Sequence, residues 1–266
     1  MTTLSIGKAW EEAVAFVSRE SALLFPVALL FVALPGLILQ EMTPPELAQW
    51  TMAQAKGSFP AVPPSYWLAL FLTIVIIWFG SLTLFALALR PGISVGEAMR
   101  LGLARLPVLL GTALLVAAAF LALVLAVALV AGALMIASKA AAATIGTLLV
   151  AIIMGCVLYA SVRLLLLNPV VIDGRDGVVA SLRRSWAVTR GHFWRLLGFI
   201  AIVMLLSMIA SMAAQAVFGL IGGLVGGATT ARLTGGIAAA AVSTVVQVYM
   251  LVMIARLYRQ ADSGAA

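Results

Sequence analysis

The chain has 266 residues, of which 64% are hydrophobic and only 9% carry a charged side chain. An average soluble domain has roughly 45–50% apolar and about 25% charged residues, so this composition excludes an ordinary soluble domain. The net charge of +7 would suggest a nucleic-acid partner in a soluble protein, but here the charges lie in short segments between apolar runs. The sequence therefore predicts an all-α integral membrane protein that does not bind nucleic acid.

Six apolar runs are long enough to cross a hydrocarbon core of ~30 Å as helices. They cover residues 22–39, 66–89, 107–136, 144–167, 196–221 and 237–257. Glu11, Glu12 and Glu20 precede the first run, unlike the basic start of a cleaved signal peptide, so we expect this span to be retained. Residues 1–266 then form a single membrane domain with both termini on the same side and no soluble catalytic domain.

The basic residues indicate which side of the membrane is cytoplasmic. With the N-terminus inside, twelve of the 16 Lys and Arg residues lie in cytoplasmic segments: Lys8, Arg19, Arg90, Arg100, Arg105, Arg175, Arg183, Arg184, Arg190, Arg195, Arg256 and Arg259. Lys56, Lys139 and Arg232 fall outside, and Arg163 lies within the fourth run. This asymmetry follows the positive-inside rule. We therefore predict a multi-pass protein of the bacterial plasma membrane with cytoplasmic termini.

A threefold repeat precedes the first, third and fifth spans, and its copies are related by adding 89 and then 172 to the numbering. Ile6, Trp10, Val14 and Val17 correspond to Val95, Met99, Leu103 and Leu106, and then to Val178, Leu182, Trp186 and Thr189. This spacing places each set on one face of a helix. We predict three repeats, at about 4–89, 93–167 and 176–257, each an interfacial amphipathic helix followed by a two-span hairpin. The apolar face should lie at the headgroup boundary.

Small and amide side chains recur every four residues in the last two runs. They are Ser207, Ser211, Gln215, Gly219, Gly223 and Gly227 in one run, and Ala239, Ser243 and Gln247 in the other. Such a pattern favours close approach of two helices in a membrane. We expect Gln215 and Gln247 to be buried and to bond each other or the backbone, with a role in a transport path as the alternative.

Titratable side chains are too few for most catalytic schemes. The chain has one His, one Cys and nine acidic residues, and none of the acidic residues lies inside a span. We therefore expect no enzyme activity, catalytic residue, metal or cofactor. Asp173 and Asp176 could be imagined as a metal or general-base pair, but a solvated turn with Asp176 as a helix N-cap is favoured. Arg163 either extends to the cytoplasmic interface or serves as an internal functional residue.

The segment from Asp173 to Arg195 is the strongest functional candidate. It brings basic, hydroxyl and aromatic side chains together at headgroup depth: Arg183, Arg184, Ser185, Trp186, Arg190, His192, Trp194 and Arg195. Arginine suits bidentate contacts with phosphate. The two interpretations are a defined phosphate-headgroup site and unspecific attraction to anionic lipid.

The same segment resembles a known family signature. Asn168-Pro169-Val170-Val171-Ile172-Asp173-Gly174, followed by the stretch from Ser181 to Arg195, is similar to the bacterial glycerophosphoryl diester phosphodiesterase membrane domain and to related polytopic proteins of the YciC type. Asp173 and Ser181 depart from the usual Glu and Ala. Some members of that family carry a following phosphodiesterase domain, whereas only a short tail follows the last apolar run here. The resemblance implies a lipid-associated membrane module.

Three functions are compatible with these features. The first is a non-catalytic protein that binds or organises anionic phospholipid or glycerol-phosphate-type lipids, alone or with a separate membrane-protein partner or a second copy. The second is a small-solute transporter or channel, which Arg163, Gln215 and Gln247 suggest. The third is a membrane scaffold subunit. Three hairpins that all start at the same face suit a lipid-binding platform better than the inverted repeats of transporters.

Overall fold

A computed structural model describes residues 5–52, 60–137, 139–174 and 176–263, and these residues are helical with no strand among them. The elements are α1 (Ile6–Ala28), the π-helix η1 (Leu29–Ala33), α2 (Leu34–Met42), α3 (Pro45–Met52), α4 (Pro64–Leu89), α5 (Val95–Ala137), α6 (Lys139–Arg163), α7 (Leu167–Asp173), α8 (Val178–Val188) and α9 (Phe193–Ser263). The all-α prediction is confirmed. Lys56 and Arg175 lie outside the described residues.

Five helical stretches are long and apolar enough to cross a membrane. They are Ile6–Met42, Pro64–Leu89, Val95–Ala133, Ile145–Asp173 and Phe193–Asp262. The chain is therefore a multi-pass membrane protein by length and composition. The amphipathic segment and the span of the second repeat, predicted as separate elements, form the single helix α5.

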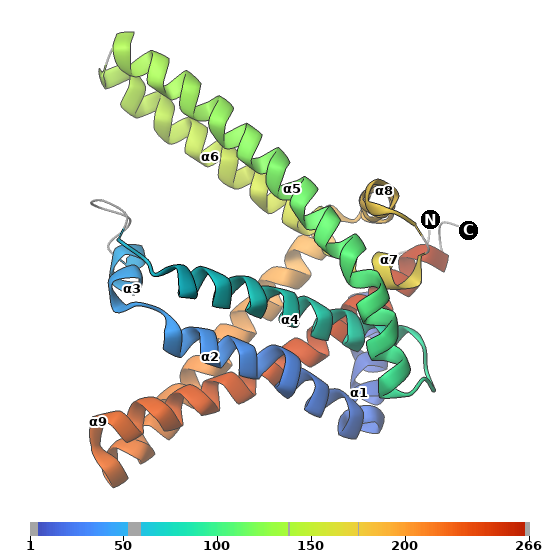
Figure 1. Cartoon of the computed structure of the whole chain (residues 1–266). Helices are drawn as coiled ribbons and strands as arrows, with labels where there is room; N and C mark the ends of the chain where they lie inside the picture. The colour runs from blue at the N-terminus through green and yellow to red at the C-terminus, as the bar shows by residue number, and fades with distance from the viewer. Residues whose placement is uncertain (1–4, 53–59, 138, 175, 264–266) are drawn as a thin grey trace.

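The last two predicted spans are the two arms of one helix, α9, which turns back on itself at Gly226 and Gly227 (Figure 1). Gly227 has a φ of 74°, a backbone conformation that glycine adopts without steric strain. Gly219 and Gly223 pack on Ala231 of the returning arm, as the spacing of small residues predicts. The sharp turn and the small side chains let the two arms run side by side.

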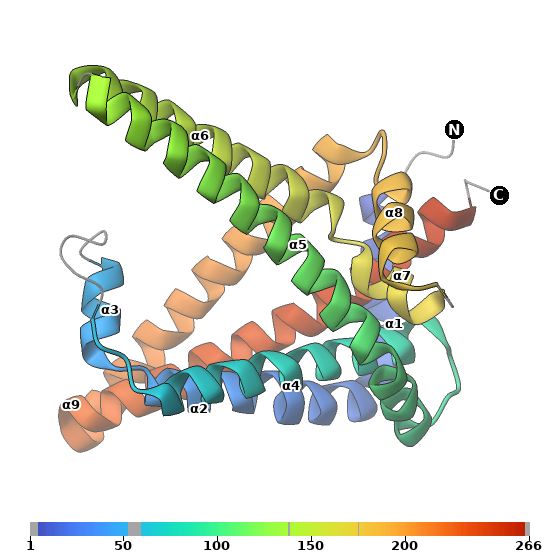
Figure 2. The ribbon, with the colours of Figure 1, turned by 45° about the horizontal axis from the view of Figure 1, so that its top comes forward.

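The core lies at the end of the molecule where both termini are found, which we call the terminal end (Figure 2). There the end of α4, the short helix α7 and the last turns of α9 contact one another. Their buried residues are concentrated in 82–89, 166–172 and 251–258. These stretches are apolar almost all round, which is typical of helices enclosed on every side.

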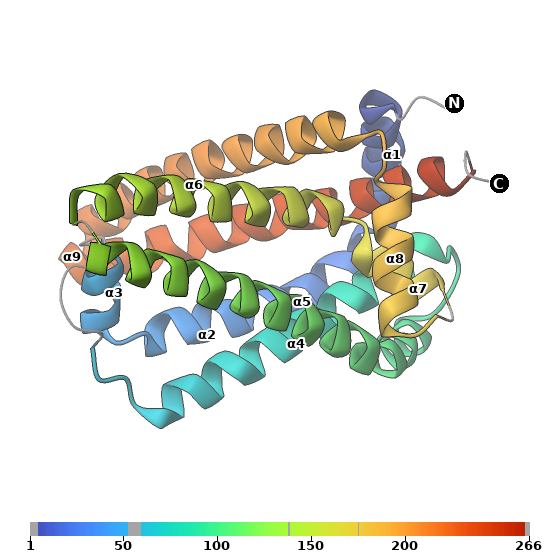
Figure 3. The same ribbon diagram turned by 90° about the horizontal axis from the view of Figure 1, so that it is seen from above.

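Three amphipathic segments surround this core and begin at equivalent positions of the predicted repeats. Ile6, Val95 and Val178 are the first residues of α1, α5 and α8. The most extensive contacts with the core helices join α1 to α9, α5 to α4 and α8 to α7, and α1 also contacts α4 while α5 also contacts α7. Figure 3 shows α8 and the first turns of α1 lying across the direction of the long helices.

The buried face of these segments differs by one residue from the predicted apolar face. The buried positions are Ala9, Ala13 and Val17 in α1, Ala98, Gly102 and Leu106 in α5, and Ser181, Ser185 and Thr189 in α8. They are related by the same offsets of 89 and 172. Trp10, Leu103 and Trp186, which belong to the predicted face, are 50%, 61% and 41% exposed. Small side chains allow close docking on the core, whereas these larger apolar side chains remain outside it.

The α5–α6 hairpin diverges from the rest of the bundle away from the terminal end (Figures 1 and 2). No residue between 113 and 133 of α5 is buried. In a membrane these apolar faces would contact lipid. The hairpin is held to the rest of the bundle at the terminal end of the molecule.

The docking of α5 on α4 predicts a contrast between two glycines of one helix. A Cβ atom at Gly102 would lie 3.0 Å from Thr83 Oγ1 and 3.6 Å from Leu82 Cβ, whereas one at Gly96 would meet nothing within 4 Å. We expect Gly102→Leu to lower the free energy of unfolding by about 1–3 kcal/mol, because overpacking displaces α5 from the core. Gly96→Leu should leave it unchanged or higher, since leucine favours a helix. Thermal unfolding in detergent measures both, and equal melting temperatures would contradict this docking.

Candidate functional site

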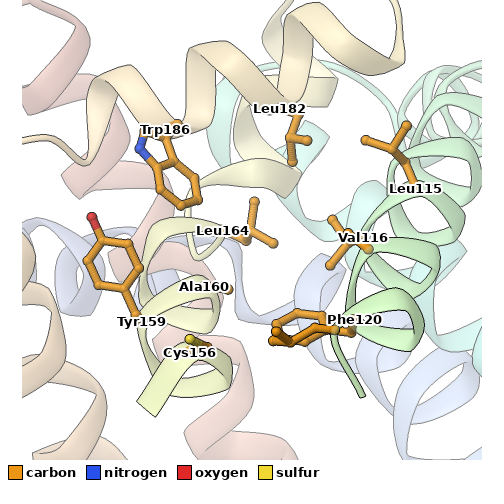
Figure 4. Close-up of a pocket in the computed structure, with 11 residues that line it drawn as sticks. Leu115, Val116, Phe120, Cys156, Tyr159, Ala160, Leu164, Leu182 and Trp186 are labelled. Atoms are coloured by element: carbon orange, nitrogen blue, oxygen red, sulfur yellow. The ribbon is translucent and has the colours of Figure 1, made fainter. Parts of the chain in front are cut away.

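An apolar pocket lies between α5 and α6 beneath α8 (Figure 4), and we call it the α5–α6 pocket. Its volume is about 370 Å³, within the range of roughly 300–1,000 Å³ of small-molecule sites. The lining side chains include Leu115, Val116 and Phe120 of α5, Cys156, Tyr159 and Leu164 of α6, and Leu182 and Trp186 of α8. Most of these residues could not be identified from the sequence, because a pocket depends on the distance between helices and not on their periodicity.

A second cavity, the arginine groove, lies along α8 beside the pocket. It measures about 460 Å³ and is lined by Val179, Leu182, Arg183, Trp186, Ala187 and Arg190. Arg183 lies in α8 and Arg190 in the turn that follows it, and both are exposed. Leu182 and Trp186 line both cavities. The apolar pocket and the basic groove therefore adjoin each other.

Arg163 lies behind these cavities with its side chain turned into the bundle. The residue is only 9% exposed. Its Nε and Nη2 atoms donate to the Tyr159 hydroxyl at 3.0 and 2.8 Å, and its guanidinium stacks on the Trp186 ring at 5.4 Å. The Nη1 atom is buried without a hydrogen-bond partner. Of the two interpretations left open by the sequence, the structure favours an internal residue over one that extends to the interface.

The end of α6 explains how α8 is held over the pocket. After Arg163 the helix is interrupted, and the Leu167 N–H donates to Leu164 instead of to Arg163. The Arg163 carbonyl accepts from the hydroxyls of Ser185 at 3.0 Å and Thr189 at 3.4 Å. Ser185 thus has a capping role, because a helix end leaves carbonyl groups that need partners.

Arg184 points away from the groove, into a cluster of carboxylates. It bonds Asp262 at 3.1 Å and lies 3.9 Å from both Asp173 and Asp176. The hydrogen bond with Asp262 raises the Arg184 pKa above its ordinary value. The expected N-cap at Asp176 was wrong: Gly177 occupies that position without a side-chain cap, since the Asp176 carboxylate faces Arg184. Arg184 therefore ties α8 to α7 and α9.

The remaining candidates of the basic segment do not line the pocket or the groove. His192 has a buried Nδ1 without a hydrogen-bond partner, and Trp194 is 79% exposed beside Phe193. Arg195 is exposed near the start of α9. In the described part of the chain no three His, Cys, Asp or Glu side chains form a group that could hold a metal ion.

Gln215 and Gln247 line a separate cavity of about 360 Å³ between η1–α2 and the two arms of α9. The expectation that both are buried was wrong, since Gln215 is exposed and Gln247 is half-buried. The reason is that the arms are joined at Ser211 and Ser243, whose hydroxyls lie 2.9 Å apart, and the amides project to the side.

Residues 4–261 match a family described as a domain of unknown function, DUF7847. The chain belongs to this family. The matched range includes α8, the α5–α6 pocket and the arginine groove. No curated protein and no solved structure matched the chain.

Two adjacent arginines of α8 should have different effects on stability. Arg184→Gln removes a hydrogen bond to Asp262 and two further ion pairs, so we expect a loss of about 1–2 kcal/mol and a melting temperature lower by a few degrees. Arg183→Gln should leave the melting temperature unchanged, because Arg183 is exposed. Thermal unfolding in detergent compares the two variants, and a larger loss for Arg183→Gln would refute this assignment.

Proposed function

We propose that this protein is a non-catalytic membrane protein that binds an anionic phospholipid, with one acyl chain in the α5–α6 pocket and the phosphate in the arginine groove. The observation that carries the proposal is the shared lining of the two cavities by Leu182 and Trp186. An amphiphile can fill both cavities at once, whereas a purely polar or purely apolar ligand fills only one.

The chemistry of each cavity supports one end of such a ligand. Leucine, valine and phenylalanine side chains line the α5–α6 pocket and suit an acyl chain. Arg183 and Arg190 offer planar donors for phosphate oxygens, a geometry in which arginine forms bidentate bonds. Arg163 adds a buried positive charge behind Trp186. A buried charge without a counter-charge is costly, so an anion nearby would be stabilised.

The proposed orientation places the terminal end in the cytoplasm of a bacterial cell, at the plasma membrane. Arg183 and Arg190 would then lie at the inner headgroup layer, where anionic lipids attract basic residues. We further propose that each arm of α9 crosses the membrane, which gives six spans arranged as three hairpins. The turn at Gly226 and Gly227 supports this, because it directs both ends of α9 toward the terminal end.

A glycerol-phosphate headgroup remains the expected ligand, and this detail rests on the resemblance of residues 168–195 to the glycerophosphoryl diester phosphodiesterase membrane domain. Those residues form α7, α8 and the start of α9. A separate membrane-protein partner, a second copy or a scaffold role stays a prediction from the sequence.

Cys156 is the only cysteine of the chain and lines the α5–α6 pocket, so it reports on pocket occupancy. In detergent micelles, a low mole fraction of phosphatidic acid should slow modification of Cys156 by N-ethylmaleimide. The same fraction of phosphatidylcholine should slow it less. We expect the Arg183→Gln/Arg190→Gln double variant to lose the difference between the two lipids, because its groove no longer binds the phosphate.

The matched control changes two arginines of the equivalent segment in the second repeat, Arg100→Gln/Arg105→Gln. Neither residue lines the pocket or the groove, so this variant should keep the lipid difference of the wild type. Equal protection by the two lipids in the wild type, or equal loss in both double variants, would refute a defined phosphate site.

Single cysteines in a Cys156→Ser background test the six spans and their orientation. In intact cells a membrane-impermeant maleimide should label Ala61→Cys and Thr229→Cys but not Ser263→Cys. The third variant should react only after permeabilisation, because six spans place it inside. Labelling of Ser263→Cys in intact cells would contradict the proposed topology.

A further inference from the structure

The cavity that contains Gln215 and Gln247 has a chemistry unlike that of the α5–α6 pocket, and we call it the glutamine chamber. Its polar lining consists of Gln40 of α2 and of Gln215, Ser243, Thr244 and Gln247 of α9. None of the lining residues that the structure describes is charged. All five polar residues belong to stretches that are apolar enough to span a membrane. A polar group inside the hydrocarbon layer costs free energy unless it has a hydrogen-bond partner.

The chamber has an open end and a closed end. Gln40 and Gln215 are exposed, whereas Val32 and Thr244 are buried. The space exists because small residues form its walls, among them Gly36 and Gly236, where an added Cβ would meet nothing within 4 Å. The π-helix η1 contributes Val32 and Ala33 to the wall next to Pro35, which cannot donate a backbone hydrogen bond. Single π-helical turns of this kind are frequent at functional sites.

The lining groups determine which ligands fit. Each glutamine amide offers two donors and an accepting carbonyl oxygen. The Thr244 hydroxyl donates to the Ala240 carbonyl, so its oxygen remains an acceptor for a ligand. A charged ligand would find no counter-charge among the described lining residues, and an apolar ligand would leave the amides without hydrogen-bond partners. A ligand with several hydroxyl groups satisfies donors and acceptors together.

We propose that the glutamine chamber binds a neutral group with several hydroxyls, either a free polyol or the glycerol headgroup of an uncharged lipid. This site is separate from the proposed phospholipid site, because the two cavities share no lining residue and lie on different hairpins. Failure of one proposal therefore leaves the other intact.

A cysteine at Ser243, in a Cys156→Ser background, reports on occupancy of the chamber. The protein is reconstituted in phosphatidylcholine vesicles and reacted with hydroxyethyl methanethiosulfonate. We expect glycerol to slow the reaction in a saturable way, by about twofold when its concentration equals its Kd. Betaine at the same osmolality should not slow it, since betaine lacks hydroxyl groups. In a second arm, monooleoylglycerol, whose headgroup keeps two free hydroxyls, replaces glycerol in the bilayer.

Two leucine variants separate chamber binding from general effects. Gly236→Leu fills the chamber and should remove the protection by either ligand, while the open space at Gly236 preserves the fold. Gly198 lies in the same helix and does not line the chamber, and a Cβ atom added there would also meet nothing within 4 Å. The protection should therefore persist in Gly198→Leu. Protection by glycerol identifies a free polyol, and protection by monooleoylglycerol alone identifies a headgroup. If neither protects, or if betaine protects equally, the proposal is overturned.

Discussion

Mutual burial of three helix ends at the terminal end is the constraint on which the rest of this structure depends. The end of α4, α7 and the last turns of α9 exclude solvent from one another through residues that are almost all apolar. Polar contacts close the cluster: Tyr258 donates to Asp173 at 2.8 Å, and Arg259 donates to the Leu89 carbonyl. Because α9 comes from the end of the chain and contacts α1, the first and last segments of the chain pack together here.

Amphipathic spacing relates the starts of the three segments, but it does not identify the face that docks on the core. The helix starts at Ile6, Val95 and Val178 lie at equivalent positions of the amphipathic spacing, which is a local property. The rotation of each helix about its axis is a tertiary property. Periodicity identifies large apolar side chains such as Trp10, whereas docking selects positions such as Ala9 where the backbones approach closely. In an apolar chain both faces lack charge, so hydrophobicity alone cannot distinguish them.

The candidate site shows a similar division between local and tertiary information. Arg183 and Arg184 are adjacent and chemically identical, yet one lines the groove and the other bonds Asp262, far along the chain. The sequence identifies the basic segment but cannot assign these roles without the position of the last helix. The lining of the α5–α6 pocket could not be predicted for the same reason. Phe120 and Cys156 are ordinary members of apolar runs, and only the relative position of the two helices identifies them as lining residues.

The hairpins differ in how tightly their arms pack, and this difference explains where the cavities lie. The arms of α9 are joined through Gly219, Gly223 and Gly235, which sit against the facing backbone or side chains. In α6, a Cβ atom added at Gly155 would meet nothing within 4 Å, and larger side chains separate α6 from α5. A space therefore opens between α5 and α6, and α8 closes it from the terminal end. The carboxylates near α8 face Arg184, and none of the ion pairs among the described residues includes Arg163, Arg183 or Arg190. The positive charge beside this pocket is thus left without an internal counter-charge, which is the electrostatic condition that favours an anionic amphiphile over a neutral one.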